Sequence, residues 1–263
     1  MKPKRLTPTA LLLLALCAAA FAQAGKDNPK TSKPAEKVSR AKGATEHAAP
    51  VVCIDPGHPS EVASGRNEQN GTNETRVAWS VALKLRESLL ARGYEVVMTK
   101  SAEGELVRNK DRALVANRAR AALMVRLHCD ASVERGFAIY YPDRPGRAKD
   151  GSTGPGSPVV EASRRAARAV HSGMAELLAG SLNDNGIRTD YQTKVGREQG
   201  GALTGSIFSE VPVVTIEMVV LSDPQDAEFI KSEEGQRRMA EAIAEGVGRF
   251  VGPAHASSPR RQD

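Results

Sequence analysis

The segment Val51-Val52-Cys53-Ile54-Asp55-Pro56-Gly57-His58 decides the fold. A short apolar run that stops at Pro-Gly is typical of a buried β-strand that ends in a turn. His58 then lies at the carboxyl end of a strand, which is where open α/β sheets carry their functional groups. We therefore expect a sheet built outward from residues 51–54, with His58 as a candidate metal ligand at its edge.

Downstream of this segment, apolar strands alternate with amphipathic helices. A helix signal begins at Thr72-Asn73, and residues 74–92 carry apolar side chains at helical spacing before Gly93, a residue type favoured just past a helix. Further strands are expected at 94–99, 123–127, 137–141 and 211–218. Further helices are expected at 110–121, at 159–182, from Asp223 onward and at 233–251. Loops or turns are expected at 142–158, 183–187 and 192–201. This alternation predicts an α/β fold, with a single layered domain and a mainly parallel sheet that has helices on both faces.

The ends of the chain differ in composition from its middle. Residues 1–22 have a basic start, a short apolar run and a small-residue ending, which indicate a signal peptide; the apolar run is too short for a stable membrane span. Residues 23–49 are rich in Lys, Ala, Pro and Ser and predict a disordered basic linker. We expect the folded domain at 50–252 and a flexible tail at 253–263.

The formal net charge of +6 is carried by these ends. Segment 50–252 is nearly neutral, so the folded part has no excess of basic residues with which to bind nucleic acid. We therefore expect no nucleic-acid partner.

Two histidines and a carboxylate, His58, Glu74 and His128, form a candidate metal site. Two imidazoles and one carboxylate suit Zn²⁺ and leave a fourth position for water, as in catalytic zinc sites. Glu217 is the lone charge in an apolar strand and is the candidate general base. We expect each of these residues at the boundary of an element. On spacing alone, structural histidines remain the alternative.

Cys53 and Cys129 both lie beside candidate metal histidines. The favoured interpretation is that they are small buried hydrophobic residues. A disulfide between them is the alternative if their strands are adjacent, and the sequence leaves that open.

Four motifs in order then point to a family. They are Ile54-Asp55-Pro56-Gly57-His58, Asn73-Glu74, Leu127-His128-Cys129-Asp130-Ala131 and Pro212-Val213-Val214-Thr215-Ile216-Glu217. Together they resemble the zinc-dependent N-acetylmuramoyl-L-alanine amidases of the bacterial cell wall (amidase type 3), over residues 51–251. The resemblance implies hydrolysis of the amide between N-acetylmuramic acid and the L-alanine of the peptidoglycan stem peptide. It also implies one Zn²⁺ held by His58, Glu74 and His128, with Glu217 as the catalytic glutamate.

The resemblance also sets expectations for partners and location. We expect a peptidoglycan substrate, a monomer, an exported protein in the periplasm or the extracellular cell wall, and an activating protein as an open alternative. Two other functions stay open: a non-catalytic peptidoglycan-binding or regulatory domain of the same fold, and an envelope zinc peptidase that cuts within the stem peptide.

Some neighbouring residues fit the family pattern and others depart from it. Asp55 and Asp130 are candidates for orienting the metal ligands. After Glu217 the family usually has a Gly-Phe pair and then Ser-Asn, whereas this chain has Met218-Val219-Val220-Leu221-Ser222-Asp223, and the loss of that glycine could narrow the pocket. Arg112 and Arg118 are expected to pair with carboxylates, with the acids of the stem peptide as the alternative partners.

Overall fold

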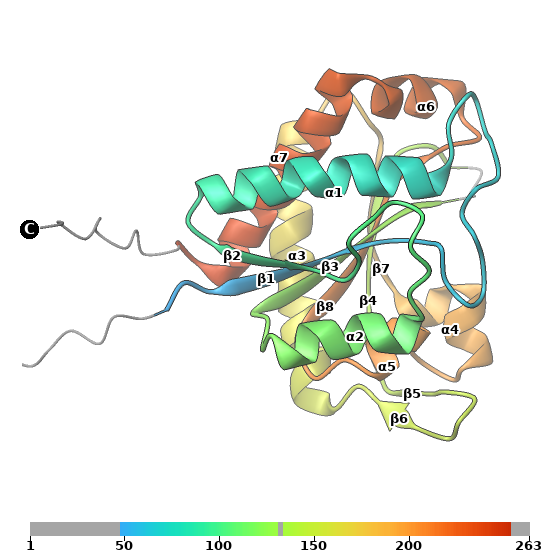
Figure 1. Cartoon of the computed structure of the whole chain (residues 1–263), viewed down its shortest axis with the longest axis vertical. Coiled ribbons are helices and arrows are strands. Elements are labelled where there is room, and N and C mark those ends of the chain that lie inside the picture. Colours follow the sequence, from blue (N-terminus) through green and yellow to red (C-terminus); the bar gives the residue numbers. More distant parts are fainter. Residues whose placement is uncertain (1–47, 131–133, 254–263) are drawn as a thin grey trace, which may run out of the picture. The chain divides into compact units, whose positions relative to one another are not determined.

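The computed structural model describes residues 48–130 and 134–253. Within them, six strands form one sheet in the order β2-β1-β3-β8-β4-β7 (Figure 1). The bounds are β1 Val51–Pro56, β2 Glu95–Met98, β3 Leu123–Asp130, β4 Phe137–Tyr141, β7 Asp184–Thr189 and β8 Val213–Val220. All neighbouring strands run parallel except β4 and β8. The prediction of a mainly parallel α/β sheet is confirmed.

Helices cover both faces of the sheet, as predicted. Helices α1 Glu74–Ala91, α3 Ser157–Leu178 and α7 Glu233–Val251 lie on one face, and α2 Asn109–Arg118 lies on the other with the short α5 Thr204–Ile207 beside it (Figure 1). Helix α6 Pro224–Lys231 leads into α7. The start of α1 at Glu74 follows from Asn73, whose side chain accepts a hydrogen bond from the backbone N–H of Arg76 at 3.0 Å.

The two faces of the strands differ in polarity. Toward α1, α3 and α7 the strands are aliphatic: Val52, Ile54, Val125, Leu127, Val214 and Ile216. Toward α2 they begin apolar, with Cys53, Met124 and Val213, and continue as Asp55, Arg126, His128, Thr215 and Glu217. Since side chains alternate along a strand, these polar residues share the α2 face near the carboxyl ends. The fold thus gathers these polar groups at the carboxyl ends of the central strands.

Three expectations about loops are wrong. Residues 183–187, expected as a turn, begin strand β7; residues 192–201 contain helix α4 Lys194–Glu198, after the 3-10 turn η1 Asp190–Gln192; and residues 142–158 contain the strand pair β5 Gly146–Arg147 and β6 Thr153–Gly154. The start of β7 has turn composition, Asp184-Asn185-Gly186, yet it pairs with β4. Pairing with a neighbour overrides local strand preference here.

The expected boundary positions of His128 and Glu217 are also wrong. Both residues lie within strands, because the ladder between β3 and β8 continues beyond them, with a register shift between His128 and Asp130. His58 and Glu74 do lie at boundaries, the first in the loop after β1 and the second at the start of α1.

Cys53 and Cys129 are free and buried, so the alternative of a disulfide is wrong. Cys53 packs on the α2 side with Ala116 and Met124. Cys129 belongs to the core on the opposite face. The sheet itself separates the two thiols.

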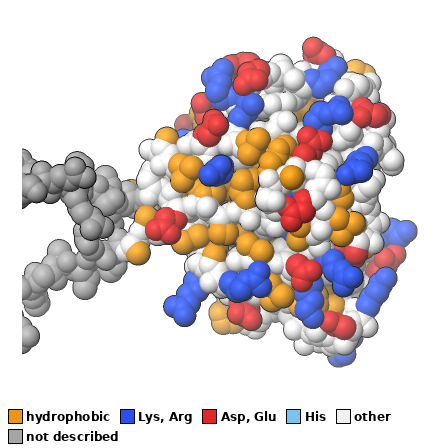
Figure 2. All heavy atoms as spheres, in the orientation of Figure 1, with side chains coloured by type: hydrophobic (Ala, Val, Ile, Leu, Met, Phe, Trp, Pro, Cys, Tyr) orange, Lys and Arg blue, Asp and Glu red, His pale blue; other side chains and the backbone are white. Residues whose placement is uncertain are grey.

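No helix of the described residues has both the length and the apolar character needed to cross a membrane. The edge strand β2 keeps its side chains half-buried or exposed, and hydrophobic side chains gather over this edge between charged regions above and below (Figure 2).

Candidate active site

His58, Glu74 and His128 converge at the carboxyl end of the sheet. Glu74 lies between the two imidazoles, with 3.3 Å from its Oε2 to His58 Nε2 and 3.0 Å from its Oε1 to His128 Nδ1. One nitrogen or oxygen atom from each of the three lies within 4.8 Å of the others. Two imidazole nitrogens and one carboxylate oxygen at this spacing fit a single Zn²⁺ ion.

The charge states of two of these residues, Glu74 and His128, also suit a metal. Burial would raise the pKa of Glu74, but contacts with His128 and His58 hold it well below its usual range, so the carboxylate is ionised. Burial lowers the pKa of His128 and favours the neutral imidazole. An ionised carboxylate and a neutral imidazole are the forms that bind a cation.

The loop that carries His58, together with Lys100, holds this residue in place. Its φ of 50° lies in the left-handed region, which is uncommon for a residue other than glycine. Lys100 Nζ donates a hydrogen bond to the His58 carbonyl oxygen, and His58 Nδ1 lies 3.1 Å from the carbonyl oxygen of Ala63. A proton on Nδ1, donated to that carbonyl, leaves Nε2 free to face Glu74 and a metal.

Gly57 leaves room for the second imidazole. A Cβ on Gly57 would lie 2.7 Å from Cε1 of His128 and 2.6 Å from the carbonyl oxygen of Leu127. The Gly57 backbone N–H donates to that same carbonyl at 2.8 Å. Only glycine allows this close approach of the loop to β3.

Glu217 lies beside His128 on the neighbouring strand, in paired register. Its Oε2 is buried and has no hydrogen-bond partner among the described residues. Burial, and then the charges of Glu74 and Asp130, raise the pKa of Glu217 well above its usual range. A carboxyl group in this environment is suited to accepting and returning a proton.

A cavity of about 520 Å³ opens beside these groups. His58, His128 and Glu217 line it, and Asp130 also contributes to its wall. Met218, Val219 and Val220, which follow Glu217 where the family usually has a Gly-Phe pair, are buried and do not line it. The departure from the family pattern therefore puts none of these three side chains in the cavity.

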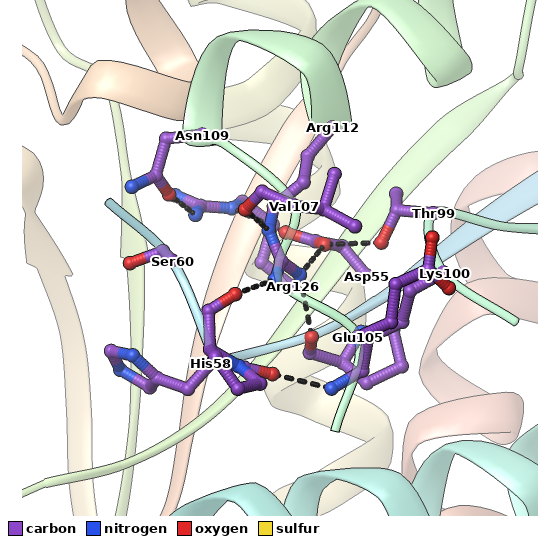
Figure 3. A network of polar contacts seen from close by, with 12 residues as sticks. Asp55, His58, Ser60, Thr99, Lys100, Glu105, Val107, Asn109, Arg112 and Arg126 are labelled. Carbon is purple, nitrogen blue, oxygen red and sulfur yellow. Dashed lines mark hydrogen bonds and ion pairs between the residues drawn. The ribbon is translucent and has the colours of Figure 1, made fainter. Parts of the chain in front are cut away.

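Behind His58 lies a buried network of charged groups centred on Asp55 (Figure 3). Asp55 Oδ1 accepts hydrogen bonds from Thr99 at 2.5 Å and from Arg112 Nη1 at 2.7 Å, and its Oδ2 accepts one from Arg126 Nε at 2.9 Å. Burial would raise the pKa of Asp55, but the two guanidinium groups lower it well below its usual range. The side chain of Asp55 thus bonds to these arginines and Thr99, while the His58 imidazole points away from the network (Figure 3).

Arg112 connects this network to the His58 loop. Its guanidinium also donates to the carbonyl oxygens of Pro56 at 2.6 Å and Pro59 at 2.8 Å, on either side of His58. The predicted pairing of Arg112 with a carboxylate is confirmed. Arg118 lies exposed at the end of α2.

Sequence reasoning missed Arg126. It is buried in β3, pairs with Asp55 and lines the cavity. The signal that singled out Glu217, a lone charge in an apolar strand, was also present at Arg126 within Leu123–Leu127.

A histidine-glutamate-histidine set, a buried carboxyl group beside it and a cavity open to both are the parts of a metal-dependent hydrolase. The family model of the N-acetylmuramoyl-L-alanine amidases matches residues 52–249. The chain belongs to this family of enzymes.

Individual relatives agree with this assignment. N-acetylmuramoyl-L-alanine amidase Rv3717 of Mycobacterium tuberculosis is 26% identical over 227 residues, which cover 78% of this chain and 87% of the relative. The amidase AmiC of Neisseria meningitidis is 28% identical over 229 residues, covering 77% of this chain and 53% of the relative. The fold is shared with the catalytic domain of CwlV from Bacillus (Paenibacillus) polymyxa, with a TM-score of 0.59 at 24% identity, over 77% of this chain and 98% of that domain.

Proposed function

We propose that this chain hydrolyses the amide between N-acetylmuramic acid and L-alanine in peptidoglycan, with one Zn²⁺ held by His58, Glu74 and His128. The observation that carries this proposal is the convergence of three ligand atoms within 4.8 Å beside the buried carboxyl of Glu217. Membership of the amidase family supplies the substrate class.

Zn²⁺, when bound, supplies a Lewis acid that polarises the amide carbonyl and makes water easier to deprotonate. Glu217 accepts the proton of the attacking water and returns it to the amide nitrogen as the carbon–nitrogen bond breaks. The products are a free lactyl carboxylate and a peptide with a new amino end. The raised pKa of Glu217 favours the second half of this transfer, in which the carboxyl group acts as an acid.

Asp55 and Asp130 act in different ways in this proposal. Asp55 fixes Arg112, which holds the carbonyl groups on both sides of His58. Asp130 lines the cavity, and its charge contributes to the raised pKa of Glu217.

We also propose that the protein is exported to the periplasm or the extracellular cell wall and acts there as a monomer. The supporting segments are the signal peptide at 1–22 and the basic linker at 23–49, most of which lies outside the described residues, as does most of the tail at 253–263. The catalytic domain would span 50–252. An activating protein partner stays a prediction.

The test combines metal analysis with product analysis. The purified protein should contain one zinc per chain and should release, from purified peptidoglycan, peptides that begin with L-alanine, as identified by mass spectrometry. Glu217→Gln should keep the zinc and lose activity by at least about 100-fold, whereas His128→Ala should lose both. Glu210→Gln, an exposed glutamate just before β8, is the matched control and should retain both.

Two results would contradict the proposal. Fragments cut within the stem peptide would identify a peptidase. Tight retention on the wall without new amino ends, at full zinc content, would identify a binding domain.

A further inference from the structure

Strands β3 and β8 present two paired rows of side chains to the cavity. His128 pairs with Glu217 in one row, and Arg126 pairs with Thr215 in the other. All four residues line the cavity. Since a parallel strand rises roughly 3.3 Å per residue, the second row lies about 7 Å from the first, toward the amino ends of the strands.

Arg126 is rigidly held in this second row. Its Nε donates to Asp55 Oδ2 at 2.9 Å and its Nη2 donates to Asn109 Oδ1 at 2.8 Å, so neither contact uses Nη1. The backbone of Gly205 packs against the guanidinium, because a Cβ there would lie 2.7 Å from Cζ of Arg126. A charged group fixed in this way binds a ligand with little loss of side-chain entropy.

The direct ion pairs around Arg126 do not fully balance its positive charge. Among the described residues, Arg112 and Arg126 share a single ion-pair partner, Asp55. Two guanidinium groups therefore face one carboxylate in direct contact. A substrate carboxylate beside Arg126 would give the second guanidinium a counter-charge of its own.

Thr215 supplies the second donor. The residue is 3% exposed, and its Oγ1 is buried with no hydrogen-bond partner among the described residues. Leaving a buried hydroxyl unpaired is unfavourable, so such a group on a cavity wall points to a ligand that accepts a hydrogen bond from it. A carboxylate accepts hydrogen bonds from both a hydroxyl and a guanidinium.

We infer that Arg126 and Thr215 form a subsite for a free carboxylate of the substrate, located on the residue that follows L-alanine in the stem peptide. The inference rests on the proposed function, which places the cleaved amide beside His128 and Glu217. Two peptide residues span at most about 7 Å, so a carboxyl group attached to the α-carbon of the second residue can reach the second row. The ligand is thus a peptide whose second residue keeps its α-carboxylate free and continues the chain through its side chain.

The subsite should discriminate against the amidated form of this residue. A carboxamide is neutral, and its NH₂ group would face donors rather than acceptors at Arg126 and Thr215. We expect kcat/KM for a muramoyl peptide with the free carboxylate to exceed that for the matched carboxamide by about 10- to 100-fold.

The test compares these two muramoyl peptides, which differ only in that carboxyl group. Thr215→Val removes the unpaired hydroxyl without changing the shape of the side chain. We expect it to lower the preference for the free carboxylate over the carboxamide several-fold. Arg126→Met should abolish the preference if the variant folds. Ser206→Ala, which removes a buried hydroxyl that does not line the cavity, is the control and should keep the wild-type preference.

A binding measurement separates recognition from chemistry. The dipeptide product with a free carboxylate should bind the zinc-loaded Glu217→Gln protein at least about 10-fold more tightly than its carboxamide, by isothermal titration calorimetry. Thr215→Val in the same background should reduce this difference.

The outcomes keep the two proposals apart. Equal cleavage of both substrates by the wild type, or an unchanged preference in Thr215→Val, would overturn the subsite and leave the amidase function intact. Failure to cleave either substrate at full zinc content would overturn the proposed function and the subsite with it.

Discussion

His128 and Glu217 are register partners on the parallel strands β3 and β8, so one hydrogen-bonded ladder holds the candidate ligand next to the candidate base. The distance between these two groups is fixed by backbone pairing in the centre of the sheet. His58 and Glu74 come instead from a loop and from a helix start. Sites on regular elements are positioned more accurately than sites on loops, so the loop needs additional support.

Gly57→Ala tests the contact between that loop and His128. A Cβ at position 57 would lie within 2.8 Å of two atoms of the His128 ring, so the loop or the imidazole must move. We expect zinc affinity to fall by about 10- to 100-fold, as for other losses of support around a metal ligand. Metal titration would measure this. Gly156→Ala, whose Cβ would come no closer than 3.8 Å to the nearest atom, should leave zinc affinity unchanged.

Asp55→Asn tests the buried network behind His58. The substitution leaves Arg112 and Arg126 buried without their shared carboxylate. Breaking a buried ion pair in this way typically lowers the free energy of unfolding by about 3 to 5 kcal/mol. Urea unfolding would measure the loss. Glu228→Gln, in an exposed pair with Lys231, should have a far smaller effect, and an equally small effect at Asp55 would contradict the assigned role.

Removing the metal should destabilise the protein. A ligand present at 100 times its dissociation constant contributes about 2.7 kcal/mol to the folded state. We expect a chelator to lower the Tm of the wild type by roughly 5 to 10 °C and to leave the Tm of His128→Ala nearly unchanged. Added Zn²⁺ should restore the wild-type Tm, and Mg²⁺, which prefers six oxygen ligands, should not. Equal responses of the two proteins to the chelator would place the metal elsewhere.

Asp190→Asn should change how stability depends on pH. Burial raises the pKa of Asp190 from 3.8 to about 6, and its Oδ1 has no hydrogen-bond partner in the described part of the chain. The folded state therefore binds this proton more tightly than the unfolded state, and the wild type loses stability as pH rises from about 4 to about 6. The variant escapes this loss and should be more stable than the wild type by about 3 kcal/mol at pH 7.

Urea unfolding of both proteins at pH 5 and pH 7 would check this prediction. Asp150→Asn provides a contrast, because hydrogen bonds with Ser152 lower the pKa of Asp150 to about 2. This variant should be less stable than the wild type at both pH values. If the difference in the free energy of unfolding between the wild type and Asp190→Asn stayed the same at pH 5 and pH 7, the raised pKa of Asp190 would not be its cause.

Strong periodicity made much of the fold predictable. The last helix was expected at 233–251 and occupies those residues, and the first strand was expected where β1 begins. Strand β7 was missed because its stability comes from pairing with β4, which no local pattern reports. The ends of β3 and β8 were placed too early for the same reason, since neighbouring strands decide how far a ladder continues.

Some residues of the site could likewise be predicted from the sequence, and others could not. The sequence contains five histidines, and their positions together with the family motifs singled out His58 and His128. The partners of Asp55 could not be found in this way, because Arg112 and Arg126 lie 57 and 71 residues further along the chain. Only the folded sheet, with helix α2 packed on it, brings these charges together.

The placement of the two thiols has a practical consequence. Cys53 and Cys129 are buried on opposite faces of the sheet, and burial raises the pKa of both well above the usual range. An oxidant meets neither a thiolate nor an accessible sulfur, and no bond between the two can form while the sheet is intact. The folded domain should therefore be the same in reducing and oxidising surroundings, and it can be produced in either without a change of structure.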